Sequence, residues 1–169
     1  MNFGTRRKVF VSYHHRGDQR WFDEFTRQFA ERYEVFCDNS LDGRIRSDDD
    51  EYVNRRIRKE HIVGSSITIV LCGAETWKRK YVDWEIHSTL HHEHALLGIA
   101  LPTAVKANAG GIFVHDRFND NFQSGYAHWL GSWVADPQAL LTAIEGAIQK
   151  SKDKSKIRND REKMGRNHP

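Results

Sequence analysis

The sequence predicts an α/β protein in which helices cover a central parallel sheet. Its 169 residues fit a single domain. Short apolar runs alternate along the chain with amphipathic segments of helical period. The run 67–72, ITIVLC, shows almost no alternation of polar and apolar residues, which is typical of a strand buried on both faces of a parallel sheet.

Four short apolar segments have the composition of strands. They are 8–13, 34–37, 67–72 and 96–101. The segment 112–114 is a candidate fifth strand within 103–135, a region with no clear period. We expect three aromatic residues to pack this region onto the body as a long loop: Tyr126, Trp129 and Trp133.

Helix starts are predicted between and after these strands. Asp18 is a residue type that caps helices, and aromatic residues follow it at helical spacing, at positions 22, 25, 29 and 33. Ser47 and Asp50 have the spacing of a capping box ahead of a charged helix. Asp136 followed by Pro137 is the strongest start, because aspartate accepts from free backbone N–H groups and proline fits the first helical position.

Alternating strands and helices form parallel sheets through right-handed crossovers. Four or five short strands fit the flavodoxin-like order 2-1-3-4-5, a three-layer sandwich. In this order ligands bind outside the carboxyl ends of strands 1 and 3, where the strand order reverses. The turns 12–18 and 73–80 are therefore the candidate site segments.

Composition and missing motifs exclude several classes of protein. The longest apolar runs, 67–74 and 95–101, are shorter than the roughly 20 residues of a membrane span. The sequence has no GxGxxG after the first strand and no GxxxxGK[ST]. Cys37 and Cys72 lie in apolar stretches, and we expect them to be buried, reduced thiols of a cytoplasmic protein.

Charge divides the chain into a body, 1–150, and a basic tail, 151–169. From residue 150 to the end there are eight Lys or Arg and three Asp or Glu. The tail has no aromatic residue interleaved with its charges, as nucleic-acid-binding surfaces have. We expect a flexible or frayed helical tail that binds neither nucleic acid nor membrane.

The helix predicted from about residue 80 to residue 90 holds the candidate catalytic group. Glu85 lies in its second turn, next to Trp84 and four residues after Tyr81. A carboxylate between aromatic side chains is partly desolvated, which raises its pKa. From spacing alone, a surface ion pair of Glu85 with Lys78 or Arg79 is the alternative interpretation.

Three segments in this order carry a resemblance to a known family: KVFVSYHHRGD, ITIVLCGAETWKRKYVDWEI and LLGIALP. They resemble the TIR-like domain family, and within it the signal-producing TIR-like proteins of the Thoeris antiphage defence system. The combination of a strand 1 that ends in S-Y/F-H, a strand 3 that ends in L-x-G and an aromatic-x-x-x-E-I helix is the specific part. The resemblance covers 8–102, and 136–150 more loosely.

The resemblance implies a TIR-like flavodoxin-like fold and NAD⁺ as substrate rather than cofactor. The nicotinamide–ribose bond is cleaved, and a cyclic or modified ADP-ribose is released that activates a partner effector. The resemblance makes Glu85 the catalytic residue and makes a homo-oligomer an open possibility. Many enzymatic relatives have Trp where this chain has Tyr81, which preserves stacking but changes the size of the pocket.

Other candidate site residues follow from their positions at strand ends. Ser12, Tyr13 and His14 end the first strand, where they either contact pyrophosphate or ribose or pack the strand end. Asp38 follows the second strand and either caps its loop or touches substrate. Trp77 either covers the pocket or packs its loop.

A metal site is a weaker alternative. His87, His91 and His94 are spaced at i, i+4 and i+7, which can hold zinc on a helix that extends that far. No Cys or carboxylate completes the set, so we expect a solvated helix end and no metal.

Two other functions remain open at this stage. One is a non-catalytic TIR-type interaction module, which would not depend on Glu85. The other is binding of RNA or a membrane surface through the basic tail, which would be lost on deleting 151–169.

Overall fold

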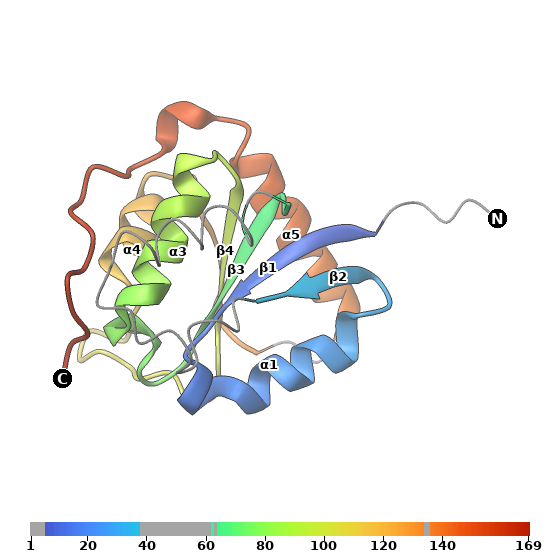
Figure 1. Cartoon of the computed structure of the whole chain (residues 1–169), viewed down its shortest axis with the longest axis horizontal. Helices are drawn as coiled ribbons and strands as arrows, with labels where there is room; N and C mark the ends of the chain where they lie inside the picture. Colours follow the sequence, from blue (N-terminus) through green and yellow to red (C-terminus); the bar gives the residue numbers. More distant parts are fainter. Residues whose placement is uncertain (1–5, 38–61, 63, 134–135) are drawn as a thin grey trace.

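The computed structural model describes residues 6–37, 62, 64–133 and 136–169 of the chain. In this part, five parallel strands form one sheet of order β2-β1-β3-β4-β5, which confirms the predicted order (Figure 1). The strands are β1 (Arg7–Ser12), β2 (Tyr33–Phe36), β3 (Ile67–Cys72), β4 (Ala95–Ala100) and β5 (His128–Leu130).

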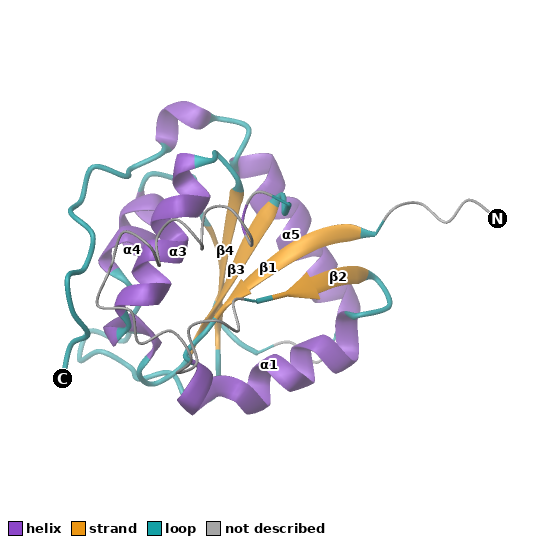
Figure 2. Cartoon of the chain, viewed as in Figure 1, coloured by secondary structure: helices purple, strands orange, loops and turns teal. Residues whose placement is uncertain are grey.

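Helices cover both faces of this sheet (Figure 2). They are α1 (His15–Phe29), α3 (Lys80–His91), α4 (Asp116–Gln123) and α5 (Pro137–Lys150), with short 3-10 helices η3 (Thr76–Lys78) and η4 (Lys154–Lys156). Among the described residues, no helix has both the length and the apolar character of a membrane span.

Each face of the sheet has its own helix pair and its own core. α1 and α5 pack on one face, against side chains that include Ile69 and Leu97. α3 and α4 pack on the other, against Val70 and Leu96. Every residue of β3 is buried, because this strand lies inside the sheet with helices on both sides.

The start of α5 is where the sequence predicts it. The Asp136 carboxylate accepts a hydrogen bond from the backbone N–H of Gln138 at 3.0 Å, and Pro137 takes the first helical position. Leu140 and Ile144 of this helix are fully buried under the sheet. The predicted helix that begins at Ser47 lies outside the described residues.

The fifth strand differs from the prediction. β5 is His128–Leu130, which pairs with β4, whereas Ile112 makes only an isolated antiparallel bridge to Lys106. Tyr126 explains the choice, since its buried ring and its hydroxyl, which donates to the His94 carbonyl at 2.8 Å, hold this segment beside β4. Two of the three aromatic residues expected in a loop do pack on the body, and the third, Trp129, belongs to β5.

The segment after α5 also differs from the expected flexible tail. From 157 to 169 the chain runs as irregular backbone along α3 and α4 (Figure 1). Its hydrogen bonds to these helices include that of the Asn159 side chain with the Arg117 guanidinium, at 3.0 Å. Backbone and amide groups of this segment make many of the contacts, and the basic side chain of Arg161 makes others with Asp120 of α4. The domain division at residue 150 itself stays a prediction.

Candidate active site

Ser12 and Glu85 meet where the strand order reverses. Ser12 is the last residue of β1 and pairs in register with Val70 of β3, while Glu85 lies in the second turn of α3. The Ser12 hydroxyl donates a hydrogen bond to the Glu85 carboxylate. The two residues are only 1% and 3% exposed, so the alternative of a surface ion pair for Glu85 is wrong.

The basic neighbours of Glu85 in sequence have another partner. Lys78 binds the carboxylate of Glu75 at 3.2 Å, and Arg79 binds the same carboxylate. Glu75, Lys78 and Arg79 all lie in the segment that connects β3 to α3. Lys78 and Arg79 are thus engaged by Glu75, whereas the buried carboxylate of Glu85 lies on the inner face of α3.

Thr89 fixes this part of α3 on the sheet. Its hydroxyl donates to the backbone carbonyl of Glu85 at 2.7 Å. The same oxygen lies 2.6 Å from the Thr68 hydroxyl of β3, and both threonines are fully buried. Val82 and Ile86 pack on the sheet on either side of Glu85, so the helix presents its carboxylate inward.

Asp18 forms the second buried polar cluster at this end of the sheet. Its carboxylate accepts from the Thr76 hydroxyl at 2.9 Å, and Thr76 in turn accepts from the backbone N–H of Gly73 at 2.8 Å. Burial raises the pKa of Asp18. Burial, with Asp18 nearby, raises the pKa of the Cys72 thiol to about 12, and Cys72 and Cys37 are both buried, free thiols, as the sequence predicts.

Asp18 does not cap α1, in contrast to the prediction. α1 begins at His15, so Asp18 lies within the first turn instead of capping it. Its side chain crosses to the turn after β3, where it packs against Gly73. A glycine directly after a buried strand, followed three residues later by Thr76, is the local signal of such a close approach.

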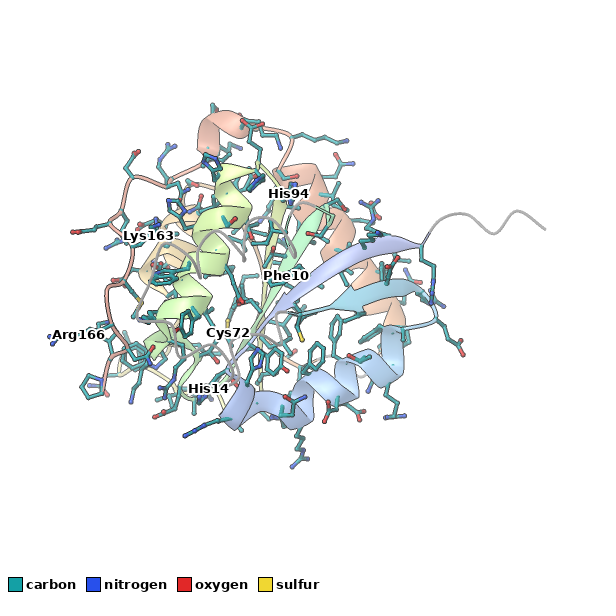
Figure 3. The ribbon with its side chains drawn as sticks, in the orientation of Figure 1. Phe10, His14, Cys72, His94, Lys163 and Arg166 are labelled. Atoms are coloured by element: carbon teal, nitrogen blue, oxygen red, sulfur yellow. The ribbon has the colours of Figure 1, made fainter. Side chains whose placement is uncertain are left out.

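Tyr13 and His14 diverge after Ser12. Tyr13 points to the α1 face, stacked between His15 at 4.2 Å and Phe22 at 4.6 Å, because successive strand residues face opposite sides. Strand-end packing therefore describes Tyr13. His14 is half-buried and lies with Cys72 at the carboxyl end of the sheet (Figure 3). Burial, aided by Arg79, lowers the pKa of His14, which favours a neutral imidazole.

The two aromatic candidates, Tyr81 and Trp77, lie in different environments. Tyr81 is half-buried, one turn before Glu85, and meets Trp84 edge to face at 5.4 Å. Trp77 stacks on Phe113, with 5.2 Å between their ring centroids. This contact corresponds to the alternative in which Trp77 packs its loop. Asp38 lies outside the described residues, so its role stays a prediction.

The histidines do not share one helical stripe. α3 ends at His91, and Glu93 takes a left-handed conformation with φ of 57°, which turns His94 out of the helix. The described residues contain no group of three His, Cys, Asp or Glu side chains that could hold a metal ion. The expectation of no metal remains a prediction.

Comparison with known proteins assigns the family. The family model of the Thoeris protein ThsB, TIR-like domain, matches residues 10–106, which is more than half of the chain. No curated protein sequence matches the chain. Among solved structures, the comparison finds the TIR domains of the activated Roq1 resistosome that directly recognises the pathogen effector XopQ, with a TM-score of 0.39 and 13% identity over 87% of this chain and 84% of that chain. On the family match, the chain belongs to the ThsB TIR-like domain family.

Proposed function

We propose that this chain cleaves the nicotinamide–ribose bond of NAD⁺ and makes an ADP-ribose-type nucleotide that activates a partner effector in antiphage defence. The observation that carries the proposal is the buried Glu85 carboxylate, held by the Ser12 hydroxyl where the strand order reverses. This edge of a doubly wound sheet is where ligands bind. The family of the chain is consistent with a role in defence.

A single carboxylate is sufficient for this chemistry. Nicotinamide begins as a pyridinium cation, so the breaking C–N bond gives its electron pair to nicotinamide, which leaves as a neutral molecule. No general acid is needed, in contrast to glycosidases that use two carboxylates. The positive charge that develops on the ribose is stabilised by an oriented anion, and Glu85 fills that role.

The fate of the ribosyl cation decides the product. Capture by water gives ADP-ribose and a proton, whereas capture by a nucleophile of the same molecule gives a cyclic product. The second route requires that water be excluded and that the substrate fold back on itself. We assign Tyr81, whose ring is half-buried one turn before Glu85, to stacking on the substrate.

A non-catalytic interaction module is the second candidate, and one observation favours it. Val105 and Phe113 are 44% and 42% exposed, and their backbones are joined by a hydrogen bond of 3.1 Å. Exposed apolar neighbours mark interaction surfaces. This candidate requires no turnover and predicts that defence depends on Phe113 but not on Glu85.

The test compares nucleotides in phage-challenged and unchallenged cells. Cells express the wild-type chain, Glu85→Gln, or the matched control Glu145→Gln, which changes an exposed glutamate of α5. Mass spectrometry follows NAD⁺ and ADP-ribose-derived species. We expect a new nucleotide with the wild type and the control only. The same nucleotide from Glu85→Gln, or none from a wild-type chain that protects the cells, would contradict the proposal.

A further inference from the structure

The helix that carries Glu85 is held on two opposite sides. Its inner face, with Val82, Glu85 and Ile86, lies on the sheet. Its outer face lies under residues 157–169, which we call the strap (Figure 1). The strap comes from the far end of the chain, so the position of α3 depends on two separate sets of contacts.

Strap contacts begin at the first turn of α3. The Asn167 side-chain oxygen accepts from the backbone N–H of Lys80 at 2.9 Å, and the His168 N–H donates to the Lys78 carbonyl at 2.9 Å. Among the described residues, the N-cap residue Arg79 supplies no side-chain cap. Asn167 therefore takes the part of a helix cap from 87 residues away.

Further strap contacts follow the same outer face. The Met164 carbonyl accepts from Trp84 Nε1 at 2.8 Å, and the Met164 N–H donates to Asp83 at 2.9 Å. One turn later, the Asn159 amide donates to the His87 carbonyl at 3.0 Å. These contacts have the spacing of one helix face. Asp83 and Trp84 follow Lys80 by three and four residues, and His87 follows them by four and three residues.

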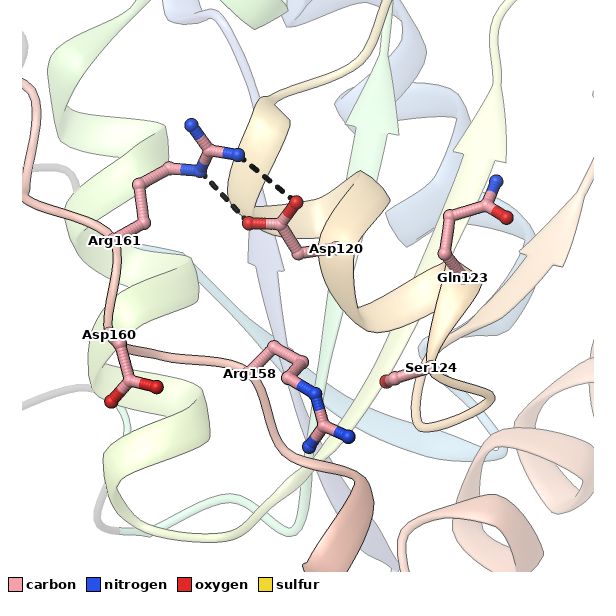
Figure 4. Close-up of a pocket in the computed structure, with 6 residues that line it drawn as sticks. All are labelled: Asp120, Gln123, Ser124, Arg158, Asp160 and Arg161. Atoms are coloured by element: carbon pink, nitrogen blue, oxygen red, sulfur yellow. Dashed lines mark hydrogen bonds and ion pairs between the residues drawn. The ribbon is translucent and has the colours of Figure 1, made fainter.

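Arg117 of α4 anchors the strap beside α3. This arginine is fully buried, and its Nε donates to Asp83 at 2.9 Å. The same guanidinium donates to the side chain of Asn159 and to the carbonyl of Glu162. At the surface, Arg161 of the strap binds Asp120 of α4 through two hydrogen bonds of 2.9 and 3.0 Å (Figure 4).

We infer that the strap positions Glu85 for reaction and that Asn167 is a positioning residue. This inference rests on the proposed function of Glu85. Tyr81 and Glu85 lie in the first two turns of α3, next to the N–H group that Asn167 caps. Losing the cap frees the first turn and lets the carboxylate move relative to Ser12. Displacements of about 1 Å in a catalytic group lower rates as much as 100-fold.

The experiment compares Asn167→Ala with two controls. Asn167→Asp keeps an oxygen acceptor at the helix N-terminus. Asn119→Ala makes the same change at an exposed position on α4. The first readout is the carboxyl ¹³C signal of Glu85 in purified, glutamate-labelled full-length chain, assigned by its loss in Glu85→Gln. The second is the ADP-ribose-type nucleotide formed in phage-challenged cells.

We expect Asn167→Ala to shift the Glu85 signal and to lower nucleotide formation about tenfold. Asn167→Asp and Asn119→Ala should match the wild type in both. An unchanged Glu85 signal in Asn167→Ala, or a shifted signal with wild-type nucleotide formation, would overturn the inference. A wild-type chain that forms no nucleotide contradicts the proposed function instead, and the carboxyl signal still decides whether the strap positions Glu85.

Discussion

Asp18 and Glu85 are both buried carboxylates beside the ends of β1 and β3, but their partners differ. Asp18 accepts from Thr76 and is packed against Gly73, so it joins α1 to the turn after β3. Glu85 accepts from Ser12 on the inner face of α3. Spacing and resemblance single out Glu85 from the sequence. Its contact with Ser12 depends on the register of β1 and β3, which no local pattern encodes.

The packing of Asp18 gives a prediction for Gly73. A Cβ atom at Gly73 would lie 2.3 Å from Asp18 Oδ1, and the short, hydrogen-bonded carboxylate has little room to move. We expect Gly73→Ala to lower the free energy of unfolding in urea by about 1–3 kcal/mol. Gly64→Ala is the matched control, because, apart from its chain neighbours, no residue in the described part of the chain lies within 4 Å of a Cβ atom built there. Equal stabilities of the two variants would refute this account of the turn.

His115 gives a prediction about pH. It is buried, its Nε2 donates to the Thr76 carbonyl at 2.8 Å, and burial lowers its pKa to about 4. Nearby Asp83 and Asp116 oppose this shift, and His168 adds to it. Because the unfolded chain binds the proton more tightly, stability is complete above the ordinary pKa of 6.5 and falls as the pH drops toward 4.

Replacing His115 tests this dependence. The largest loss in the free energy of unfolding that the lowered pKa of His115 can cause is about 3 kcal/mol. In urea unfolding at several pH values, His115→Gln should lose less stability than the wild type between pH 6.5 and 4. His91→Gln, at an exposed histidine, should follow the wild-type curve. Parallel curves for His115→Gln and the wild type would show that His115 is not the source of the dependence.

Among the helices and strands, those with the strongest local sequence patterns were the ones that the sequence predicted. The uninterrupted apolar run of β3 and the Asp136-Pro137 start of α5 were sufficient to place both elements. β5 was missed because its sequence, HWL, is only three residues long, and α4 was missed because its sequence, DRFNDNFQ, is short and largely polar. α4 is buried through Phe118 and Arg117, and the guanidinium of that arginine pairs with Asp83 of α3 and donates hydrogen bonds to Asn159 and Glu162 of the C-terminal segment.

The cap of α5 tests whether local sequence determines this element. Asp136→Ala removes the acceptor of the Gln138 N–H and should lower the free energy of unfolding by about 1 kcal/mol. Asp136→Asn keeps an oxygen at this position and should be close to the wild type. Thermal unfolding measures both. Equal losses in the two variants would indicate that the charge of Asp136, rather than its cap, stabilises the helix.

For the molecule as a whole, the structure differs from the sequence-based prediction in the C-terminal segment. Its composition, basic and without aromatic residues, is typical of a solvated tail. Its attachment depends on the buried pair of Arg117 and Asp83, which lie 34 residues apart, and on backbone groups, which carry no sequence signal. The fold class could therefore be predicted, whereas the contacts of this segment with the outer face of α3 could not.

The most direct test of the proposed function follows the nicotinamide–ribose bond of NAD⁺. NAD⁺ labelled in its nicotinamide ring is added to lysates of phage-challenged cells that express the wild-type chain, Glu85→Gln or Glu145→Gln. Free nicotinamide reports cleavage whether the ribosyl cation is captured by water or within the molecule. We expect nicotinamide release above the background of empty cells for the wild type and Glu145→Gln, and background release for Glu85→Gln. Release by Glu85→Gln at the wild-type rate would refute the proposed function.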